Sequence, residues 1–290
     1  MATKVYVENY VGILPGIFDK KSVFLRSFGG ELQTIVGAEA MEDFLKLKIS
    51  DTDVVIQEYS TDENVGFGTG TGDTNRFGPR KHIKSTNLQV PFDTPLAIHE
   101  GIDNLTVSDL PDEVVAERLA LHALAWADRY DAVMGKELSD NASVTLTGEL
   151  SESGVTKLFA EARKTFVNNS VSKNIGWVAY VTADVFNFLV DSQLATTNKN
   201  SSVNVDAQTL YSFKGFILSE IMDENFQEGE QAYFVADGVG VAGIGIPSTR
   251  TMDSEDFFGV VLQAAGKLGK YIPVKNKKAI VKAKLTAPVL

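Results

Sequence analysis

Residues 108–138 read SDLPDEVVAERLALHALAWADRYDAVMGKEL and have the pattern of one long amphipathic helix. Ser108 and Asp109 supply side-chain oxygens for the helix N-cap, and Pro111 suits the first turn. Apolar and aromatic residues recur every three or four positions along one face: Val115, Leu119, His122, Trp126, Tyr130 and Val133. About 28 residues at a rise of 1.5 Å predict a rod of roughly 40 Å, well above the length of an average globular helix.

A two-stranded arm with a glycine-rich tip precedes this helix. Alternating residues at Asp53–Tyr59 predict the first strand, and Asn87–Val90 predicts the return strand. The polar tip between them lacks the Gly-Lys-Ser/Thr ending of a phosphate-binding loop. A long arm beside a rigid helix is unusual for an enzyme core and suits a protein that reaches over its neighbours.

The tip supplies the candidate residues for contacts between subunits. Its glycines provide mobility and tight turns, and its basic side chains would allow docking on an acidic neighbour. A solvated loop explains the same residues equally well. The candidates are Gly66, Gly68, Gly70, Gly72, Arg76, Arg80, Lys81 and Lys84.

The remaining segments predict an α+β fold with separated elements rather than a regular βαβ alternation. The first 35 residues lack a long periodic pattern and predict an extended N-terminal arm, followed by a short helix at Ala38–Ile49. Further helices are expected at Val155–Val167 and Ala183–Leu194. Strands are expected at Trp177–Val181, Ile217–Met222, Gln231–Ala236, Gly259–Ala264, Tyr271–Val274 and Ala279–Leu285, with a polar loop at Ala195–Asp206.

Composition indicates a soluble, non-secreted protein with a packed core. The 290 residues are 44% hydrophobic and 22% charged, and none is cysteine, which excludes disulfides, thiolate metal sites and cysteine nucleophiles. No segment resembles a signal peptide or approaches the roughly 18 apolar residues of a membrane helix. A membrane is therefore not among the expected partners.

The net charge of −11 is unevenly distributed. Residues 267–290 contain seven lysines and no acidic residue, so the rest of the chain is more acidic than the total. An acidic body argues against a dedicated DNA-binding surface. The lysines predict either a strand with a solvated basic face at a sheet edge, or a contact with nucleic acid or an acidic neighbour.

No motif predicts catalysis, a cofactor or a metal site, so no residue is expected in any of these roles. Gly238–Gly243 fits G-x-G-x-x-G, but the glycine and proline that follow argue against the helix that a dinucleotide site requires. Carboxylates such as those at 253–256 are common at turns. The histidines, which form no ligand pair, are His82, His99 and His122.

The order of these parts resembles the major capsid proteins of tailed bacteriophages, whose fold encapsulins share. Phe92–Glu100 looks like the family's return strand, and Leu110–Leu138 is similar to its spine helix. Trp177–Phe186, Gly215–Leu218 and Ala232–Gly238 are similar to strands and a helix of its axial domain. The resemblance implies an N-terminal arm with a short helix at 1–50, an extended loop at 51–95, a peripheral domain with the spine helix at 96–150 and 251–290, and an axial domain at 151–250.

The same resemblance implies a structural, non-enzymatic function. Copies are expected to form hexamers and pentamers of an icosahedral shell around double-stranded DNA, assembled in the host cytoplasm and located in the virion. It also implies a separate scaffolding protein, because no long extension precedes the arm, together with a portal and room for a decoration protein. The alternatives are an encapsulin-type shell that holds cargo, a helical tail tube or sheath, and a nucleotide-binding enzyme that uses Gly238–Gly243.

Overall fold

A computed structural model describes residues 22–30, 33–34, 42–50, 54–61, 76–78, 80–105, 111–191, 203–204, 209–210 and 212–286. Gly66, Gly68, Gly70, Gly72 and most of the polar loop at 195–206 therefore lie outside the described residues. The chain divides into two units, which we describe separately. The arm unit is Asp43–Pro91, and the main unit is Met1–Glu42 with Phe92–Leu290.

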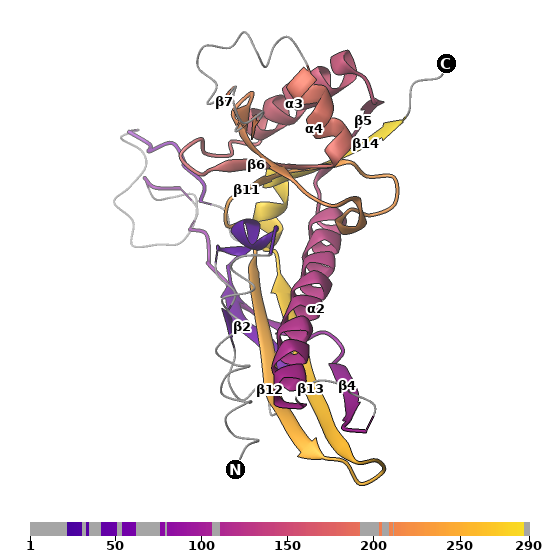
Figure 1. The fold of residues 1–290 in the computed structure, drawn as a ribbon. Coiled ribbons are helices and arrows are strands. Elements are labelled where there is room, and N and C mark those ends of the chain that lie inside the picture. Colours follow the sequence, from indigo (N-terminus) through magenta and orange to yellow (C-terminus); the bar gives the residue numbers. More distant parts are fainter. Residues whose placement is uncertain are drawn as a thin grey trace. The chain divides into compact units, whose positions relative to one another are not determined.

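A four-stranded sheet and the long helix form one part of the main unit (Figure 1). The sheet has the order β1-β12-β13-β4, in which β12 and β13 form a long antiparallel hairpin. Helix α2, Pro111–Asp140, confirms the predicted rod and lies along this sheet. The strands are β1 (Gln33–Thr34), β4 (Leu96–Asp103), β12 (Val241–Asp253) and β13 (Gly259–Tyr271).

Tyr130 fixes α2 to the backbone of this hairpin. Its hydroxyl lies 3.1 Å from the carbonyl oxygen of Gly243 and 2.8 Å from that of Gly269, which are paired residues of β12 and β13. The helix is thus held by a buried polar contact as well as by its apolar face.

A second sheet has the order β5-β14-β11-β6-β10-β9, and helices α3 and α4 pack beside it (Figure 1). Its central strands β6 and β11 are buried at every residue. Phe159 of α3 packs edge-to-face on Phe234 at 4.9 Å between ring centroids, and Phe166 packs on Phe216 at 5.3 Å. The elements are β5 (Val144–Glu149), α3 (Glu152–Asn168), β6 (Trp177–Val181), α4 (Ala183–Asp191), β9 (Ser212–Phe213), β10 (Phe216–Glu220), β11 (Ala232–Ala236) and β14 (Ile280–Thr286).

Short elements complete the main unit. They are the 3-10 helices η1 (Leu25–Phe28), η4 (Asp223–Asn225) and η5 (Val274–Ala279), and the two-residue strands β7 (Val203–Asn204) and β8 (Thr209–Leu210). The predicted strand at Tyr271–Val274 is wrong, because Tyr271 ends β13 and Val274 begins η5. The other predicted strands after residue 150 are confirmed, although β12 was not foreseen.

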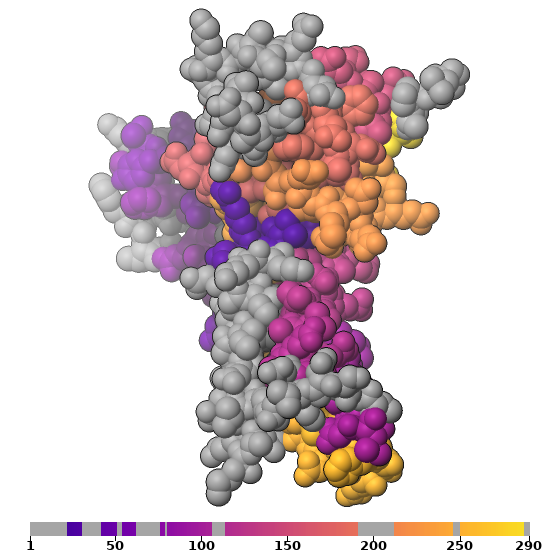
Figure 2. All heavy atoms as spheres, viewed as in Figure 1, coloured from indigo at the N-terminus to yellow at the C-terminus, as the bar shows by residue number. Residues whose placement is uncertain are grey.

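Residues 22–30 are not an extended arm, contrary to the prediction for this part of the first 35 residues. Phe24 and Phe28 are fully buried in the core of the main unit. Arg26 forms a two-point ion pair with Asp237, at 2.7 and 2.8 Å. Figure 2 shows the outer surface of this segment in indigo beside orange residues of the same unit. The segment is an integral part of the fold because its aromatic side chains complete the core.

Strand β14 also lies where the sequence did not place it. One of the two interpretations of the lysine-rich end was a strand at a sheet edge, but β14 pairs with β5 on one side and β11 on the other. Lys282 is a partner of the buried Glu230, at 2.9 Å, whereas Lys284 is exposed. The lysines of this strand therefore have different roles, and edge protection is not one of them.

The described residues of the arm unit form one antiparallel ladder, between β2 (Asp43–Ile49) and β3 (Thr86–Pro91). The return strand is confirmed, but the predicted helix ending at Ile49 is wrong over the described residues 43–49. The predicted strand at Asp53–Tyr59 is also wrong, because residues 54–59 form no ladder in the part of the chain that the structure describes. Alternation of Leu45, Leu47 and Ile49 with lysines explains the strand.

Candidate functional site

Three of the predicted contact residues lie together on one exposed segment of the arm unit. Arg80, Lys81 and Lys84 are exposed and have no ion pair among the described residues. Ile83 lies between them with 71% of its surface exposed. We call Phe77–Lys84 the basic segment. Arg76 differs, since it is partly buried and its carbonyl oxygen accepts a hydrogen bond from the Ser60 amide at 2.9 Å.

Large apolar side chains are exposed throughout the arm unit. Val54 and Ile56 are 94% and 96% exposed, and Phe77 is 75% exposed although its ring packs against Tyr59. Among the described residues of this unit, Phe44 is the one buried apolar side chain. A two-stranded ribbon with so little buried surface is marginal in water. Its exposed apolar side chains indicate a surface that another molecule covers.

Exposed apolar side chains also lie near the turn between β12 and β13, in the main unit. Phe258 is 70% exposed and Met252 is 41% exposed. Leu105, 80% exposed, follows β4 at the same end of the sheet, where the Asn104 amide donates to the Phe258 carbonyl at 2.9 Å. The sequence has carboxylates at 253–256, and such residues are common at turns. It did not predict the exposed apolar side chains, because exposure of Phe258 depends on where the hairpin ends.

The histidines do not converge on a reactive centre. His122 is buried on α2 with its Nε2 atom 2.8 Å from Glu100 Oε2, and Arg118 pairs with the same carboxylate. The hydrogen bond from Arg118 is the main cause that lowers the pKa of Glu100, against the opposing effect of burial. This cluster joins β4 to α2. No group of three or more potential metal ligands occurs among the described residues.

His99 belongs to a polar row on the outer face of the four-stranded sheet. Arg250 Nε donates to Gln263 Oε1 at 2.6 Å, and Gln263 Nε2 lies 3.2 Å from His99 Nε2. The row borders a hollow of about 430 Å³. The three side chains come from the neighbouring strands β4, β13 and β12. Their hydrogen bonds therefore link these strands and stabilise the sheet.

The glycine-rich sequence Gly238–Gly243 is a turn and a strand. Gly238 has a φ of +67°, which suits the tight turn after β11, and β12 begins at Val241. No helix follows, so the helix N-terminus that would bind a pyrophosphate is missing here. This geometry contradicts the nucleotide-binding alternative.

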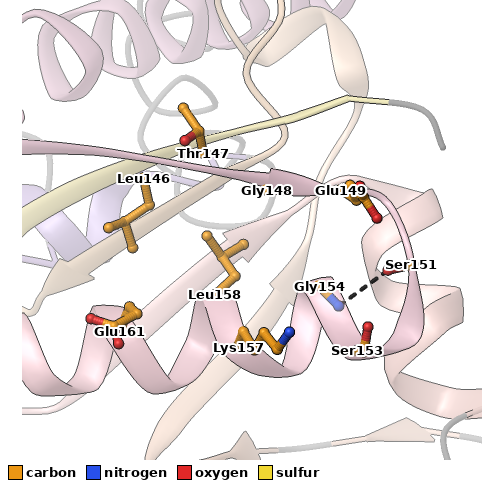
Figure 3. A pocket seen from close by; sticks show the side chains of 10 residues that line it. All are labelled: Leu146, Thr147, Gly148, Glu149, Ser151, Ser153, Gly154, Lys157, Leu158 and Glu161. Atoms are coloured by element: carbon orange, nitrogen blue, oxygen red, sulfur yellow. Dashed lines mark hydrogen bonds between the residues drawn. The ribbon is translucent and has the colours of Figure 1, made fainter. Parts of the chain in front are cut away.

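A hollow of about 320 Å³ lies between β5 and α3 (Figure 3). Leu146 and Leu158 line its interior, and Lys157 and Glu161 extend from α3 beside it. Ser151 caps α3 through the Gly154 amide at 3.2 Å, so the nearest helix end is already satisfied. The lining residues offer no convergent set of catalytic groups. None of the described helices is long and apolar enough to span a membrane.

Comparison with known proteins gives matches at the level of structure. No family model and no curated protein matches the sequence. The mature capsid of bacteriophage PhiM1 matches with a TM-score of 0.66 and 12% identity, over 92% of this chain and 87% of that one. This is a capsid fold.

Two further structures extend the similarity. The capsid of cyanophage P-SCSP1u matches with a TM-score of 0.64 and 9% identity, over 92% of this chain and 89% of that one. A virus-like particle from Pyrococcus furiosus matches with a TM-score of 0.52 and 12% identity, over 96% and 99% of the two chains. The predicted capsid fold, shared by phage heads and encapsulin-like particles, is therefore confirmed.

Proposed function

We propose that this chain is the major capsid protein of a tailed bacteriophage. Copies assemble into hexamers and pentamers of an icosahedral head that encloses double-stranded DNA. The observation that carries the proposal is the capsid fold over most of the chain. The role is structural, and the chain performs no catalysis.

We match the two units, and the two larger sheets of the main unit, to the parts of a capsid subunit. We assign α2 and the four-stranded sheet to the peripheral domain, and the six-stranded sheet with α3 and α4 to the axial domain. We assign the extended loop to the arm unit, Asp43–Pro91, in place of residues 51–95, and propose that it lies over an adjacent subunit. Arg80, Lys81 and Lys84 contact that subunit, and the four tip glycines, which lie outside the described residues, stay candidates for the same contact.

The exposed apolar surface of the arm unit supports the proposal that contacts with neighbouring subunits stabilise this unit. When a neighbour covers these side chains, burial of their apolar surface stabilises the contact by about 25 cal/mol per Å². Each contact is weak alone and becomes strong when a closed shell repeats it many times. Weak single contacts allow misplaced subunits to leave during growth of the shell.

The remaining partners follow from the same role. A scaffolding protein and a portal would act during assembly, and a decoration protein is compatible with the shell. The packaged DNA would be enclosed by the shell without sequence-specific contacts. The finished protein would reside in the virion after assembly in the host cytoplasm.

The second candidate function is an encapsulin-type shell that holds protein cargo. The specific observation in its favour is the match to the virus-like particle over nearly the whole of both chains. The two functions differ in what fills the particle.

The contents of native particles test the proposal. Particles purified from the source cells are treated with nuclease and then opened. Nuclease-protected double-stranded DNA of uniform length supports the phage head. Particles that contain a specific enzyme and no protected DNA support the encapsulin-type shell, and the absence of any closed particle contradicts both.

A further inference from the structure

The end of the β12–β13 hairpin is an apolar patch with an acidic rim. Leu105 and Phe258 form the exposed apolar part, brought together by the hydrogen bond from the Asn104 amide to the Phe258 carbonyl. Between Arg250 and Lys267 the sequence has three acidic residues and no basic one. All three are exposed and have no ion pair within the described part of the chain. We call this surface the hairpin knob; it consists of Leu105, Asp253, Glu255, Asp256 and Phe258.

The knob is held in one conformation by its own turn. Ser254 Oγ accepts hydrogen bonds from the amides of Asp256 at 3.1 Å and Phe257 at 3.3 Å. The Ser254 amide donates to the Gly259 carbonyl at 2.9 Å. A Cβ atom at Gly259 would lie 1.9 Å from the carbonyl oxygen of Ile102, so only glycine allows β13 to approach β4 this closely. A fixed surface of this kind loses little entropy when a partner binds.

The basic segment of the arm unit has the complementary chemistry. It presents Arg80, Lys81 and Lys84, with no acidic residue from Phe77 to Lys84. Phe77 and Ile83 are 75% and 71% exposed. Three unpaired cations with two apolar side chains thus match three unpaired carboxylates with two apolar side chains. Opposite charges around apolar contacts favour one partner and one register.

We propose that the hairpin knob is the docking surface for the basic segment of a second copy of this chain. This inference rests on the proposed function and narrows the neighbour's contact to one end of one hairpin. Apolar contacts between Phe258 and Ile83 supply burial, and the charges fix the orientation. A partner of another class, such as nucleic acid, would be repelled by the acidic rim.

Charge exchange between the two surfaces tests the docking. Lys81→Glu/Lys84→Glu and Asp253→Lys/Glu255→Lys should each raise the protein concentration needed for shell assembly by about tenfold or more, because repulsion is repeated at every contact. The chain that carries all four changes should assemble within about threefold of the wild-type concentration. Circular dichroism of unassembled subunits confirms that each variant is folded.

A matched control separates a specific contact from net charge. Glu224→Lys/Glu228→Lys changes two exposed carboxylates of the main unit that lie outside the knob. Combined with Lys81→Glu/Lys84→Glu, it gives the same net charge as the four-change chain. The proposal predicts no rescue in this combination, and equal rescue by both combinations overturns it.

Mixing the two knob and segment variants tests whether the contact joins different copies. Each variant alone pairs like charges, but a mixture places the reversed segment of one chain against the reversed knob of the other. The proposal predicts that the mixture assembles at a concentration at which neither variant does. Failure of the mixture, when the four-change chain assembles, places the contact within one chain and overturns the inference. Absence of shells from the wild-type protein contradicts the proposed function instead.

Discussion

Lys282 shows how a single residue can have a role that its local sequence hides. Its Nζ atom lies 2.9 Å from Glu230 Oε1 and 3.0 Å from Ser139 Oγ. Tyr233 donates to the other oxygen of Glu230 at 2.7 Å. Burial alone would raise the pKa of Glu230, but hydrogen bonds from Lys282, Tyr233 and Ser139 bring it below its ordinary value. The carboxylate is therefore ionised and depends on its cation.

Replacing Lys282 by alanine should destabilise the subunit by about 3–5 kcal/mol, because it leaves a buried charge without its partner. Lys284→Ala is the matched control, two residues along the same strand. Lys284 is exposed and should change stability by no more than about 0.5 kcal/mol. Urea unfolding of unassembled subunits measures both. Equal effects of the two substitutions would show that Lys282 is not a structural cation.

Asp131 connects α2 to the beginning of the described N-terminal segment. Its carboxylate accepts hydrogen bonds from Ser22 Oγ at 2.7 Å and from the Val23 amide at 3.2 Å. Burial raises the pKa of Asp131 from 3.8 to about 6, although these hydrogen bonds oppose the rise. The folded chain thus holds this proton more tightly than the unfolded chain does.

Stability from Asp131 should therefore change between pH 4 and pH 6. Its contribution is fully present below the unfolded pKa of 3.8 and is lost as the pH rises through about 6. Wild type should gain about 1–3 kcal/mol relative to Asp131→Asn between pH 7 and pH 5. Thermal unfolding of both proteins at the two pH values measures the difference. If the difference in stability between the two proteins is the same at both pH values, Asp131 is not the titrating group.

The long helix shows how an element depends on close approach by its neighbour. Gly135 lies inside α2, where glycine costs about 0.5–1 kcal/mol of helix propensity relative to alanine. A Cβ atom there would lie 2.5 Å from the carbonyl oxygen of Asn225 and 3.0 Å from the Phe24 ring. Tertiary packing thus requires a residue that local propensity disfavours.

Gly135→Ala should destabilise the subunit by about 1–3 kcal/mol in spite of its better helix propensity, because the backbone at Asn225 has to move. Lys136→Ala is the control at the neighbouring exposed position. It removes one solvent-exposed pair with Asp140, so it should leave the stability of the subunit nearly unchanged. The melting temperatures of the two variants measure these effects. A Gly135→Ala protein that is more stable than wild type would contradict the close contact between Gly135 and the backbone at Asn225.

The elements differ in how far the sequence predicts them. Helix α2 and strand β6 follow from strong local patterns, and both are confirmed. The error at 43–49 came from choosing a helical period where Leu45, Leu47 and Ile49 alternate with lysines. Strand β12 was missed because its first half is rich in glycine, and it exists through pairing with β13.

The candidate contact residues also differ in how far the sequence predicts them. Exposure of Arg80, Lys81 and Lys84 agrees with their composition-based selection, although the contact itself stays a prediction. The hairpin knob could not be predicted, because Leu105 and Phe258 lie about 150 positions apart in the sequence and meet through the pairing of β4 with β13. Lys282 and Glu230 are likewise brought together by strand pairing.

At the scale of the whole molecule, the arm unit should be required for assembly and dispensable for folding of the main unit. Deleting residues 66–84 should leave the circular dichroism and the cooperative unfolding of the subunit intact, because the described contacts of the main unit's sheets lie elsewhere. Closed shells should not form, since the surface that reaches a neighbour is gone. Sedimentation distinguishes shells from subunits. A deletion variant that assembles normally, or that does not fold, contradicts this role.

Electron cryomicroscopy of the assembled protein tests the central claim most directly. The account predicts closed icosahedral shells built from hexamers and pentamers, with the arm unit of each copy lying over an adjacent copy. Helical tubes, or only unassembled subunits under conditions in which the protein is folded and its partners are present, would contradict it.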